Sequence, residues 1–350
     1  MSLPGSNVGN LRNVRTSLSL LGLLYASVLL AGLLAPYDPT EQNRDMPFAP
    51  PSRLHFAEPR GTFRLRPFVY RVVSKPGSFG EYAEERGTTY PMRFLVRGAP
   101  YRIAGILSCT RHLFGFDEPA KVFLFGSDEY GRDVFSRLLY GGQISLVAGL
   151  LAASLALGLG TILGGLAGFY GGWADEICMR VAELFLALPW LYLLLAVRAT
   201  LPLHIDPVQA FLFLVVVIGM VGWARPARLI RGIVLSGKLR EHVLAARAFG
   251  ASDSYLLRRH VLPQAAGVVF AQLAVLIPQY ILAEVTLSFF GLGVGEPVPS
   301  WGNMLAAAQR YDVLTSYWWM FLPGIALSPV FLLYYTLANA LHQQTARLTS

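Results

Sequence analysis

Long apolar runs alternate with polar connections over most of the chain. Six runs are close to the length of about 20 residues that an α-helix needs to cross a bilayer. Because lipid offers the backbone no hydrogen-bond partners, runs of this kind must be helical. The pattern predicts an all-α polytopic membrane protein with six transmembrane helices, at about residues 16–36, 143–169, 177–200, 208–225, 265–290 and 317–341.

A different pattern occupies the long stretch between the first two runs, about residues 37–140. It opens with proline-rich sequence and continues with stretches such as TFRLRPFVYRVV and PMRFLVRG, in which apolar and polar residues alternate. A period of two, with turn residues between the stretches, is typical of β-strands. We therefore expect a small β-rich insert here. A loosely ordered loop is the alternative interpretation.

Lysine and arginine in the short connections indicate the orientation of the chain. Arg12 and Arg15 precede the first run, and the connection between the fourth and fifth runs is the most basic of the short ones. Its basic residues are Arg225, Arg228, Arg231, Lys238, Arg240, Arg247, Arg258 and Arg259. Because short basic loops stay in the cytoplasm, we expect both termini on the cytoplasmic side and the insert on the outer side. The first run is longer than the apolar part of a signal peptide, so we interpret it as an uncleaved span.

These features divide the chain into three regions. Residues 1–36 are the N-terminal cytoplasmic segment and first transmembrane helix, and residues 37–140 are the extracytoplasmic insert. Residues 141–345 are the helical core, with five transmembrane helices. The core includes a polar cytoplasmic loop at about residues 239–263.

The composition agrees with a membrane protein. Hydrophobic residues make up 54% of the chain and charged residues only 14%, whereas about a quarter of a soluble domain is charged. The net charge of +8 comes without a basic tail, so we expect it to orient the chain in lipid and not to bind nucleic acid. The two cysteines, Cys109 and Cys178, have no metal or redox spacing, and no metal site is predicted.

Small residues recur every four positions in the second run, at Ala156, Gly160, Gly164 and Gly168. A stripe of small side chains on one helix face lets another helix approach closely. We therefore predict a helix-packing face. The G-x-G patterns nearby do not follow a strand, so they do not indicate a dinucleotide site.

One carboxylate, Glu284, lies inside the apolar run PQYILAEVTLSFFGLG. A charge at that depth is costly unless it faces protein or water, so a place in a translocation pathway or a helix contact is expected. We group Ser288, one turn further along, with it. A buried structural carboxylate that hydrogen-bonds to a neighbouring helix is an equally good interpretation.

The charged segment FGSDEYGRDVFSRLLYGG leads into the second run. Its residues Asp128, Arg132, Asp133 and Arg137 could be taken for a catalytic constellation. We favour an amphipathic helix at the membrane edge, with these charges in water. An intramembrane enzyme would need a convergent nucleophile or metal set, and no such spacing is present, so no catalytic residues are predicted.

The loop sequence LREHVLAARAFGASDSYLLRRHVLPQ is polar, unlike the runs on either side of it. Its pattern predicts a helix with Gly250 just past its end, then a second helix capped by Ser252 or Asp253 and interrupted by Pro263. Two short helices joined by a fixed turn suit docking into a partner's groove. The residues alone favour equally an amphipathic helix resting on anionic lipid.

This loop resembles the cytoplasmic loop of ABC importer permeases, in which Glu-Ala-Ala is followed by a glycine and then Leu-Pro. The blocks FGSDEYGRDVFSRLLYGGQISL, AGFYGGWADEICMRVAELFLALP, ILAEVTLSFFGLGV and PSWGNML resemble the dipeptide, oligopeptide and nickel branch of that family. The resemblance runs over about residues 12–36 and 122–340 and leaves out most of the insert.

The resemblance implies a six-helix permease subunit of the bacterial cytoplasmic (inner) membrane that passes peptides. It further implies a second homologous permease, two ABC ATPase subunits or a homodimer of one, and an extracytoplasmic substrate-binding protein. ATP and magnesium would bind to the ATPases, and this chain would carry no cofactor and be no enzyme. In agreement, it has no phosphate-binding loop, since Gly237 and Lys238 are followed by Leu239.

By the same resemblance, the loop would couple the permease to the ATPase. The residues assigned to this role are Glu241, Leu244, Ala245, Ala246, Gly250, Ala251, Ser252, Asp253, Leu262 and Pro263. Leu244 stands where the family has glutamate. Glu241, one turn earlier, could replace that charge in part, or Leu244 could fill an apolar pocket of the ATPase. The alternative function is an ATP-independent channel or secondary transporter that uses Glu284.

Overall fold

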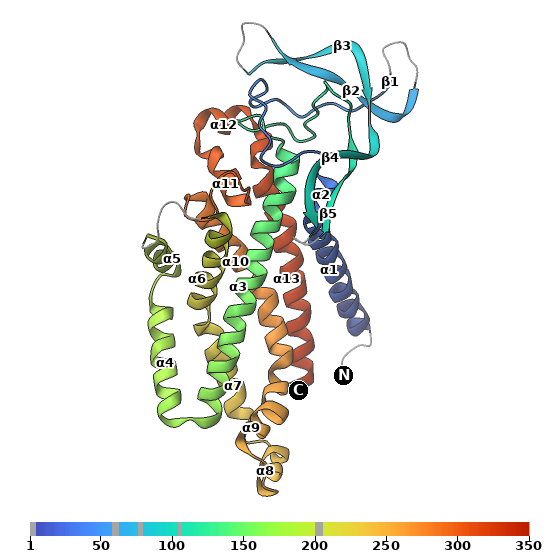
Figure 1. Cartoon of the computed structure of the whole chain (residues 1–350). Helices are drawn as coiled ribbons and strands as arrows, with labels where there is room; N and C mark the ends of the chain where they lie inside the picture. Colours follow the sequence, from blue (N-terminus) through green and yellow to red (C-terminus); the bar gives the residue numbers. More distant parts are fainter. Residues whose placement is uncertain (1–4, 58–62, 76–79, 104–106, 200–205, 350) are drawn as a thin grey trace. The chain divides into compact units, whose positions relative to one another are not determined.

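The computed structural model describes residues 5–57, 63–75, 80–103, 107–199 and 206–349 (Figure 1). The chain divides into two compact units, which we describe separately. The core unit comprises Met1–Leu21, Leu146–Leu287 and Ser328–Ser350. The insert unit comprises Gly22–Ser145 and Ser288–Leu327.

The chain is mainly helical. Its longer helices are α1 (Gly5–Leu29), α3 (Val134–Tyr170), α4 (Gly172–Ala187), α5 (Trp190–Ala199), α6 (Pro207–Gly222), α7 (Ala224–Gly237), α10 (Ala266–Phe289) and α13 (Leu322–Thr349). Three helical stretches are long and apolar enough to cross a membrane: Val134–Tyr170, Asp253–Phe289 and Trp318–Gln343. The number rises to five if the bent pairs α4–α5 and α6–α7 each form one span. In α1, the apolar part Val14–Leu29 is shorter.

Both bends have causes in the sequence. Pro189 follows Leu188, whose extended backbone (φ −81°, ψ 136°) ends α4, because a residue before proline avoids the helical region. The helices on either side meet at 90°. The milder bend of 44° between α6 and α7 lies near Pro226, which lacks the N–H that would continue the ladder.

Antiparallel strands are present in the part of the chain where the sequence alternates. They are β1 (His55–Ala57), β2 (Phe63–Ser74), β3 (Tyr82–Pro91), β4 (Arg93–Ile103) and β5 (Leu107–Gly115). The first three form one sheet in the order β1-β2-β3, and β4 pairs with β5. The register places Val69 opposite Tyr90 and Val96 opposite His112. Phe68, Val69 and Tyr70 of β2 are buried, so one stretch of this strand supplies core.

The remaining helices of the insert unit are short. They are α2 (Ala31–Leu34), α11 (Trp301–Ala306) and α12 (Tyr311–Ser316). Ser300 and Asn303 form a reciprocal capping box at the start of α11, which satisfies two backbone N–H groups. In the same unit, Phe48 stacks on Tyr317 with ring centroids 4.2 Å apart. The segment after residue 300, through Met304, Val313 and Trp319, shares one core with Phe48 and Val134.

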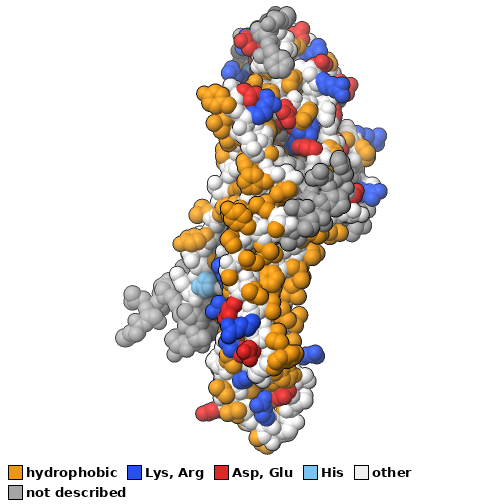
Figure 2. Space-filling view, turned by 90° about the vertical axis from the view of Figure 1, so that its left-hand side faces the viewer, with side chains coloured by type: hydrophobic (Ala, Val, Ile, Leu, Met, Phe, Trp, Pro, Cys, Tyr) orange, Lys and Arg blue, Asp and Glu red, His pale blue; other side chains and the backbone are white. Residues whose placement is uncertain are grey.

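Apolar side chains are also exposed on the helices. Figure 2 shows one face of the molecule, on which hydrophobic side chains cover much of the helical surface. Large exposed examples occur on three successive helices: Leu184 of α4, Tyr192 of α5, and Val208 and Leu212 of α6. Soluble monomers rarely expose so many large apolar side chains on successive helices. Such a surface suits contact with lipid or with another membrane helix.

Candidate functional site

The polar loop 239–263 folds as two short helices joined at a glycine. α8 (Glu241–Ala248) ends at Phe249, and Gly250 follows with φ +86°. The N–H of Gly250 donates to the carbonyl of Arg247 (3.0 Å), and the N–H of Ala251 donates to that of Ala246 (3.1 Å). These two bonds form a Schellman motif, whose left-handed position favours glycine. The predicted helix, glycine and second helix are confirmed.

The second helix changes its hydrogen-bond pattern before it becomes α10. α9 (Asp253–Leu256), which follows Ser252 as its N-cap, passes into a π-helical turn, Leu257–Val261, and a 3₁₀ turn, Leu262–Ala265. Pro263 supplies no N–H, and its ring cannot sit against the carbonyl four residues earlier in an α-helix. The α-helical hydrogen-bond pattern therefore changes at Leu257, before the proline, whereas the sequence predicts the interruption at Pro263 itself.

The inner side of the loop is held by a hydrophobic core. The core joins the loop to the end of α3 and to α7, through Phe169, Ile230, Val234, Val243, Leu256, Leu257, Val261 and Ala265. Arg247 lies over the ring of Phe169, with its guanidinium carbon 5.6 Å from the ring centroid. Lys238 Nζ donates to the carbonyls of Gly168 (2.8 Å) and Phe169 (3.0 Å) at the end of α3. The negative end of the helix dipole stabilises a cation at this position.

The predicted loop residues divide between two sides. Ala246, Ala251 and Leu262 pack partly buried against this core. The others are exposed: Glu241, Leu244, Ala245, Gly250, Ser252, Asp253 and Pro263. Leu244 is 46% exposed, and Phe249, which the sequence does not single out, is 92% exposed. The loop thus presents apolar side chains outward from a buried base.

The stripe of small residues on α3 lies against α7. A Cβ built on Gly160 would come within 2.5 Å of Pro226 Cβ and 2.9 Å of Ala227 N. On Gly164 it would overlap the backbone of Ala227, and on Gly168 it would lie 2.8 Å from the Arg231 carbonyl oxygen. Ala156 is fully buried. The two helices therefore touch at backbone distance, where no larger side chain fits.

Glu284 and Ser288 lie one turn apart on α10. Both side chains are buried, with Glu284 wholly inaccessible to solvent. Ile281 on the same helix packs close to Gly149 of α3. The structure thus places Glu284 inside the protein and away from the lipid. Its part in a pathway remains a prediction.

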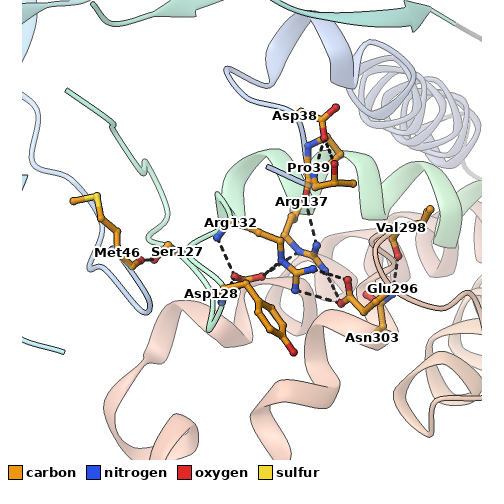
Figure 3. Close-up of polar contacts among 12 residues, drawn as sticks. Asp38, Pro39, Met46, Ser127, Asp128, Arg132, Arg137, Glu296, Val298 and Asn303 are labelled. Atoms are coloured by element: carbon orange, nitrogen blue, oxygen red, sulfur yellow. Dashed lines mark hydrogen bonds and ion pairs between the residues drawn. The ribbon is translucent and has the colours of Figure 1, made fainter. Parts of the chain in front are cut away.

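The insert unit contains a buried cluster of charges that connects distant segments (Figure 3). Arg132 Nε donates to Asp128 Oδ2 (2.6 Å) and Arg132 Nη1 donates to Glu296 Oε2 (2.6 Å). Arg137 Nη2 donates to Glu296 Oε1 (2.9 Å), and Arg137 Nη1 donates to the carbonyl of Pro39 (3.3 Å). The side chains of the two arginines are only 5% and 2% exposed. Two guanidinium groups are thereby neutralised by two carboxylates.

The expectation that these charges lie in water is therefore wrong. Asp128, Arg132, Asp133 and Arg137 are all buried. Both arginines share the partner Glu296, which follows the apolar run of α10 and lies 164 residues from Arg132. A cue was present in the sequence, because Asp128 and Arg132 are four residues apart beside an apolar run and Glu296 is the next isolated carboxylate after Glu284.

Burial affects the ionisation of this cluster. The buried position of Asp133 raises the pKa of its carboxyl to about 6, although Ser136 donates to it from both its N–H (2.8 Å) and its hydroxyl (2.6 Å). For Arg132, burial lowers the pKa, but the attraction of Asp128 and Glu296 outweighs burial and the pKa is raised. The guanidinium therefore stays charged.

A cavity of about 370 Å³ adjoins the cluster. Its charged lining residues are Asp128, Glu129, Arg132, Arg137, Glu296 and Arg310. The signs balance, and the two buried guanidiniums are already occupied by carboxylates. Among the described residues no group of three or more histidine, cysteine, aspartate or glutamate side chains could hold a metal ion. The cluster is thus built to hold segments together.

Comparison with known proteins identifies the class. Residues 160–347 match the family of binding-protein-dependent transport system inner membrane components. The chain is 38% identical over 217 residues to the oligopeptide transport system permease protein OppC of Bacillus subtilis, with 61% of this chain and 68% of the relative covered. It is 37% identical over 211 residues to the dipeptide transport system permease protein DppC of the same organism, with 60% and 64% covered.

The chain belongs to this family of inner-membrane transport components. It is accordingly a permease subunit, located in a membrane, of a binding-protein-dependent ABC transport system that has further subunits. The family match begins at residue 160 and therefore excludes the whole of the insert. The chain spans a little less than two thirds of the dipeptide permease.

Proposed function

We propose that this chain is one permease half of an ATP-driven importer that passes peptides across the bacterial cytoplasmic membrane. The names of the relatives, permeases for oligopeptides and dipeptides, support peptide as the substrate class. Membership of a binding-protein-dependent family supports delivery of the substrate by a separate binding protein.

The proposed topology has six transmembrane helices and both termini in the cytoplasm. The three long apolar stretches, the two bent pairs and α1 would supply the six. The basic residues of the loop support a cytoplasmic location for it. The strands of residues 37–140 then form an extracytoplasmic insert.

The proposed partners follow from the same topology. A second homologous permease would complete the pathway, two ATPase subunits or a homodimer would bind from the cytoplasm, and a binding protein would approach from outside. ATP and magnesium would bind to the ATPases. The absence of a phosphate-binding loop from this sequence supports that division.

The exposed tip of loop 239–263 on its buried base is the observation that carries the proposal. Phe249 and Leu244 offer apolar contact area to an ATPase groove. Behind them, Val243 and Leu256 pack into the core that also contains Ile230 of α7. A displacement of the tip would therefore move α7 and the end of α3 together, and would reach α10 directly through the backbone.

Other residues have supporting roles in the proposal. Glu284 and Ser288 would border the translocation pathway or a helix contact, since both are buried on α10. The stripe Ala156, Gly160, Gly164 and Gly168 would keep α3 and α7 together while the loop moves. Rigid contact between these helices is needed if a push on the loop is to open or close the pathway.

Purification of the chain from its native membrane in mild detergent tests the function. The expected result is recovery of a second permease and of ATPase subunits, with ATP hydrolysis stimulated by a peptide-loaded binding protein. Reconstitution into vesicles should then give peptide uptake that requires ATP. Recovery of the chain alone, with peptide uptake independent of ATP, would instead indicate a self-sufficient transporter.

A further inference from the structure

The two-stranded sheet β4–β5 has an unusual surface. Its sequences, RFLVRGAPYRI and LSCTRHLFG, contain four arginines and no acidic residue. Large apolar side chains are exposed on it: Phe94, Leu95, Leu107 and Leu113. The arginines Arg93, Arg97, Arg102 and Arg111 are exposed as well. A sheet that faces only water would not combine so many exposed leucine and phenylalanine side chains with charge of one sign.

The second half of β2, with Lys75 directly after it, provides a contrast within the same unit. There, basic side chains have acidic partners close by: Lys75 lies 3.0 Å from Glu81 and Arg71 lies 3.9 Å from Glu85. On β4–β5, Arg93 reaches Asp117, 2.6 Å away and beyond the end of β5. The strands themselves offer no carboxylate to Arg97, Arg102 or Arg111. These three arginines suit an anionic partner from outside the chain.

The position of β4–β5 is fixed by its contacts with α2. The ring of Tyr101 lies directly against Gly32, which leaves no space for a side chain there. His112 Nδ1 is 2.6 Å from the carbonyl oxygen of Ala35, just past the end of α2. The sheet is thus attached where the apolar helix α1 gives way to α2 (Figure 1). If α1 is a membrane span, this is the level of the lipid headgroups.

We propose that β4–β5 is a membrane-surface contact that binds anionic phospholipid headgroups. Leu95 and Leu107 would enter the interfacial layer, and Arg97, Arg102 and Arg111 would meet the phosphates. Arginine suits this place because its stem packs on apolar groups while its planar head binds phosphate oxygens. Basic side chains beside an apolar surface are attracted to anionic headgroups at the membrane interface. The inference rests on the proposed topology, in which α1 is the first span.

Lipid is favoured over a protein partner because of where the sheet is attached. An acidic protein would also satisfy the arginines, but it would have to displace the headgroups that already surround the end of a span. Exposed leucine and phenylalanine side chains at that level are accommodated by lipid without any partner. Binding of a protein there is therefore an outcome of the test.

Site-specific fluorescence on the full chain tests the contact. The chain, with its transport partners, is reconstituted into vesicles of phosphatidylcholine alone or of phosphatidylcholine with phosphatidylglycerol. Native cysteines are removed by Cys109→Ser and Cys178→Ala, and an environment-sensitive label is placed through Leu107→Cys. The matched control is Ser74→Cys, an exposed position in the charge-paired half of β2. Lipids carrying a spin label on the acyl chain act as the quencher.

The label at 107 should show blue-shifted emission and quenching in vesicles that contain phosphatidylglycerol, whereas the label at 74 should show neither. Combined charge reversal, Arg97→Glu with Arg102→Glu and Arg111→Glu, should abolish the shift. Arg71→Glu with Lys75→Glu on β2 should leave it unchanged. These controls separate a headgroup contact from general insertion.

Two results would overturn the proposal. One is water-like emission at 107 in both lipids; the other is a shift that occurs only when the substrate-binding protein is added, which would make the sheet a protein interface. Peptide-stimulated ATP hydrolysis is measured on the same vesicles. If hydrolysis persists while the label at 107 stays in water, only the lipid contact fails and the importer function stands.

Discussion

Arg247 at the end of α8 forms an ion pair with Asp253 at the start of α9, with Nη2 and Oδ1 3.0 Å apart. The pair spans the turn at Gly250. An exposed pair of this kind contributes little to stability, but together with the buried base it fixes the angle between the two short helices. Phe249 is therefore presented at a defined position, as a docking contact requires.

Replacing Phe249 with alanine should weaken ATPase binding without unfolding the chain. The side chain is 92% exposed, so its loss should change the free energy of unfolding by no more than about 0.5 kcal/mol. If it fills a groove of the ATPase, its loss should lower the affinity by roughly tenfold or more. Titration of the reconstituted permease with purified ATPase measures this, and Tyr311→Ala, another exposed aromatic of the chain, is the control. Equal affinity for the Phe249 variant and the control would contradict the proposed contact.

Leu244→Glu should alter coupled ATP hydrolysis and leave the melting temperature unchanged. The residue is half-exposed on the outward side of α8, so a charge there needs no desolvation in the free subunit but would enter an apolar contact in the complex. Leu244→Met keeps the apolar volume and should retain coupling. Unchanged peptide-stimulated hydrolysis in the glutamate variant would show that this position does not touch the ATPase.

Gly164→Leu should disrupt the packing of α3 on α7. Any Cβ at this position overlaps the backbone of Ala227, which cannot yield as a flexible side chain could. Overpacking typically costs about 1–3 kcal/mol, and a backbone clash lies at the upper end. A Cβ on Gly158 of the same helix would meet no atom within 4 Å, so Gly158→Leu should be tolerated. Thermal unfolding in detergent compares the two, and equal melting temperatures would refute the close contact.

Arg137→Met should destabilise the insert unit. It removes one of the two cations that Asp128 and Glu296 share. Because Arg132 remains and the Glu296 side chain is 46% exposed, the loss should fall below the roughly 3–5 kcal/mol that breaking a fully buried pair typically costs. Arg310→Ala removes an exposed arginine that pairs with Asp312 and should change little. Thermal unfolding followed by tryptophan fluorescence measures both, because Trp319 lies in the same unit. Similar melting temperatures for the two variants would argue against the cluster as a structural tie.

Asp133 should make stability depend on pH. Its pKa rises from an ordinary value of 3.8 to about 6 on folding, so the folded chain binds more protons than the unfolded chain between these values. Stability should therefore fall as the pH rises from 3.8 to about 6, with the loss complete above that window. Asp133→Asn should remove this fall, while its amide oxygen still accepts from Ser136. The slope of melting temperature against pH for the two proteins decides the matter. A slope that is unchanged by the substitution would assign the dependence elsewhere.

Local features were predicted well from the sequence, and distant contacts were not. The helix end at Gly250 depends on neighbouring residues alone, because only glycine takes φ +86° without strain. The charges of residues 125–142 depend on Glu296, which no short-range pattern connects to Arg132 or Arg137. An amphipathic helix in water and a buried ion-pair cluster give the same local sequence pattern.

The prediction of the membrane spans succeeded only in part. Apolar length located the long helices, but Pro189 interrupts the predicted run 177–200, the run predicted at 208–225 continues through a 44° bend into α7, and the run at the N-terminus is a shorter apolar helix. Hydropathy measures how apolar a segment is and does not register where its ladder is interrupted. The positions and angles of the bends could therefore not be predicted from hydropathy.

Lys238 follows α7 but holds the last carbonyls of α3. The Lys238 side chain therefore helps to hold the buried base of the loop against α3, although in sequence the residue stands next to the exposed Leu239. A chimera that receives the loop of another permease must keep Lys238 and the buried Val243, and can exchange only outward positions such as Leu244 and Phe249. Folding and partner choice are thus separable parts of one short segment, each open to engineering without the other.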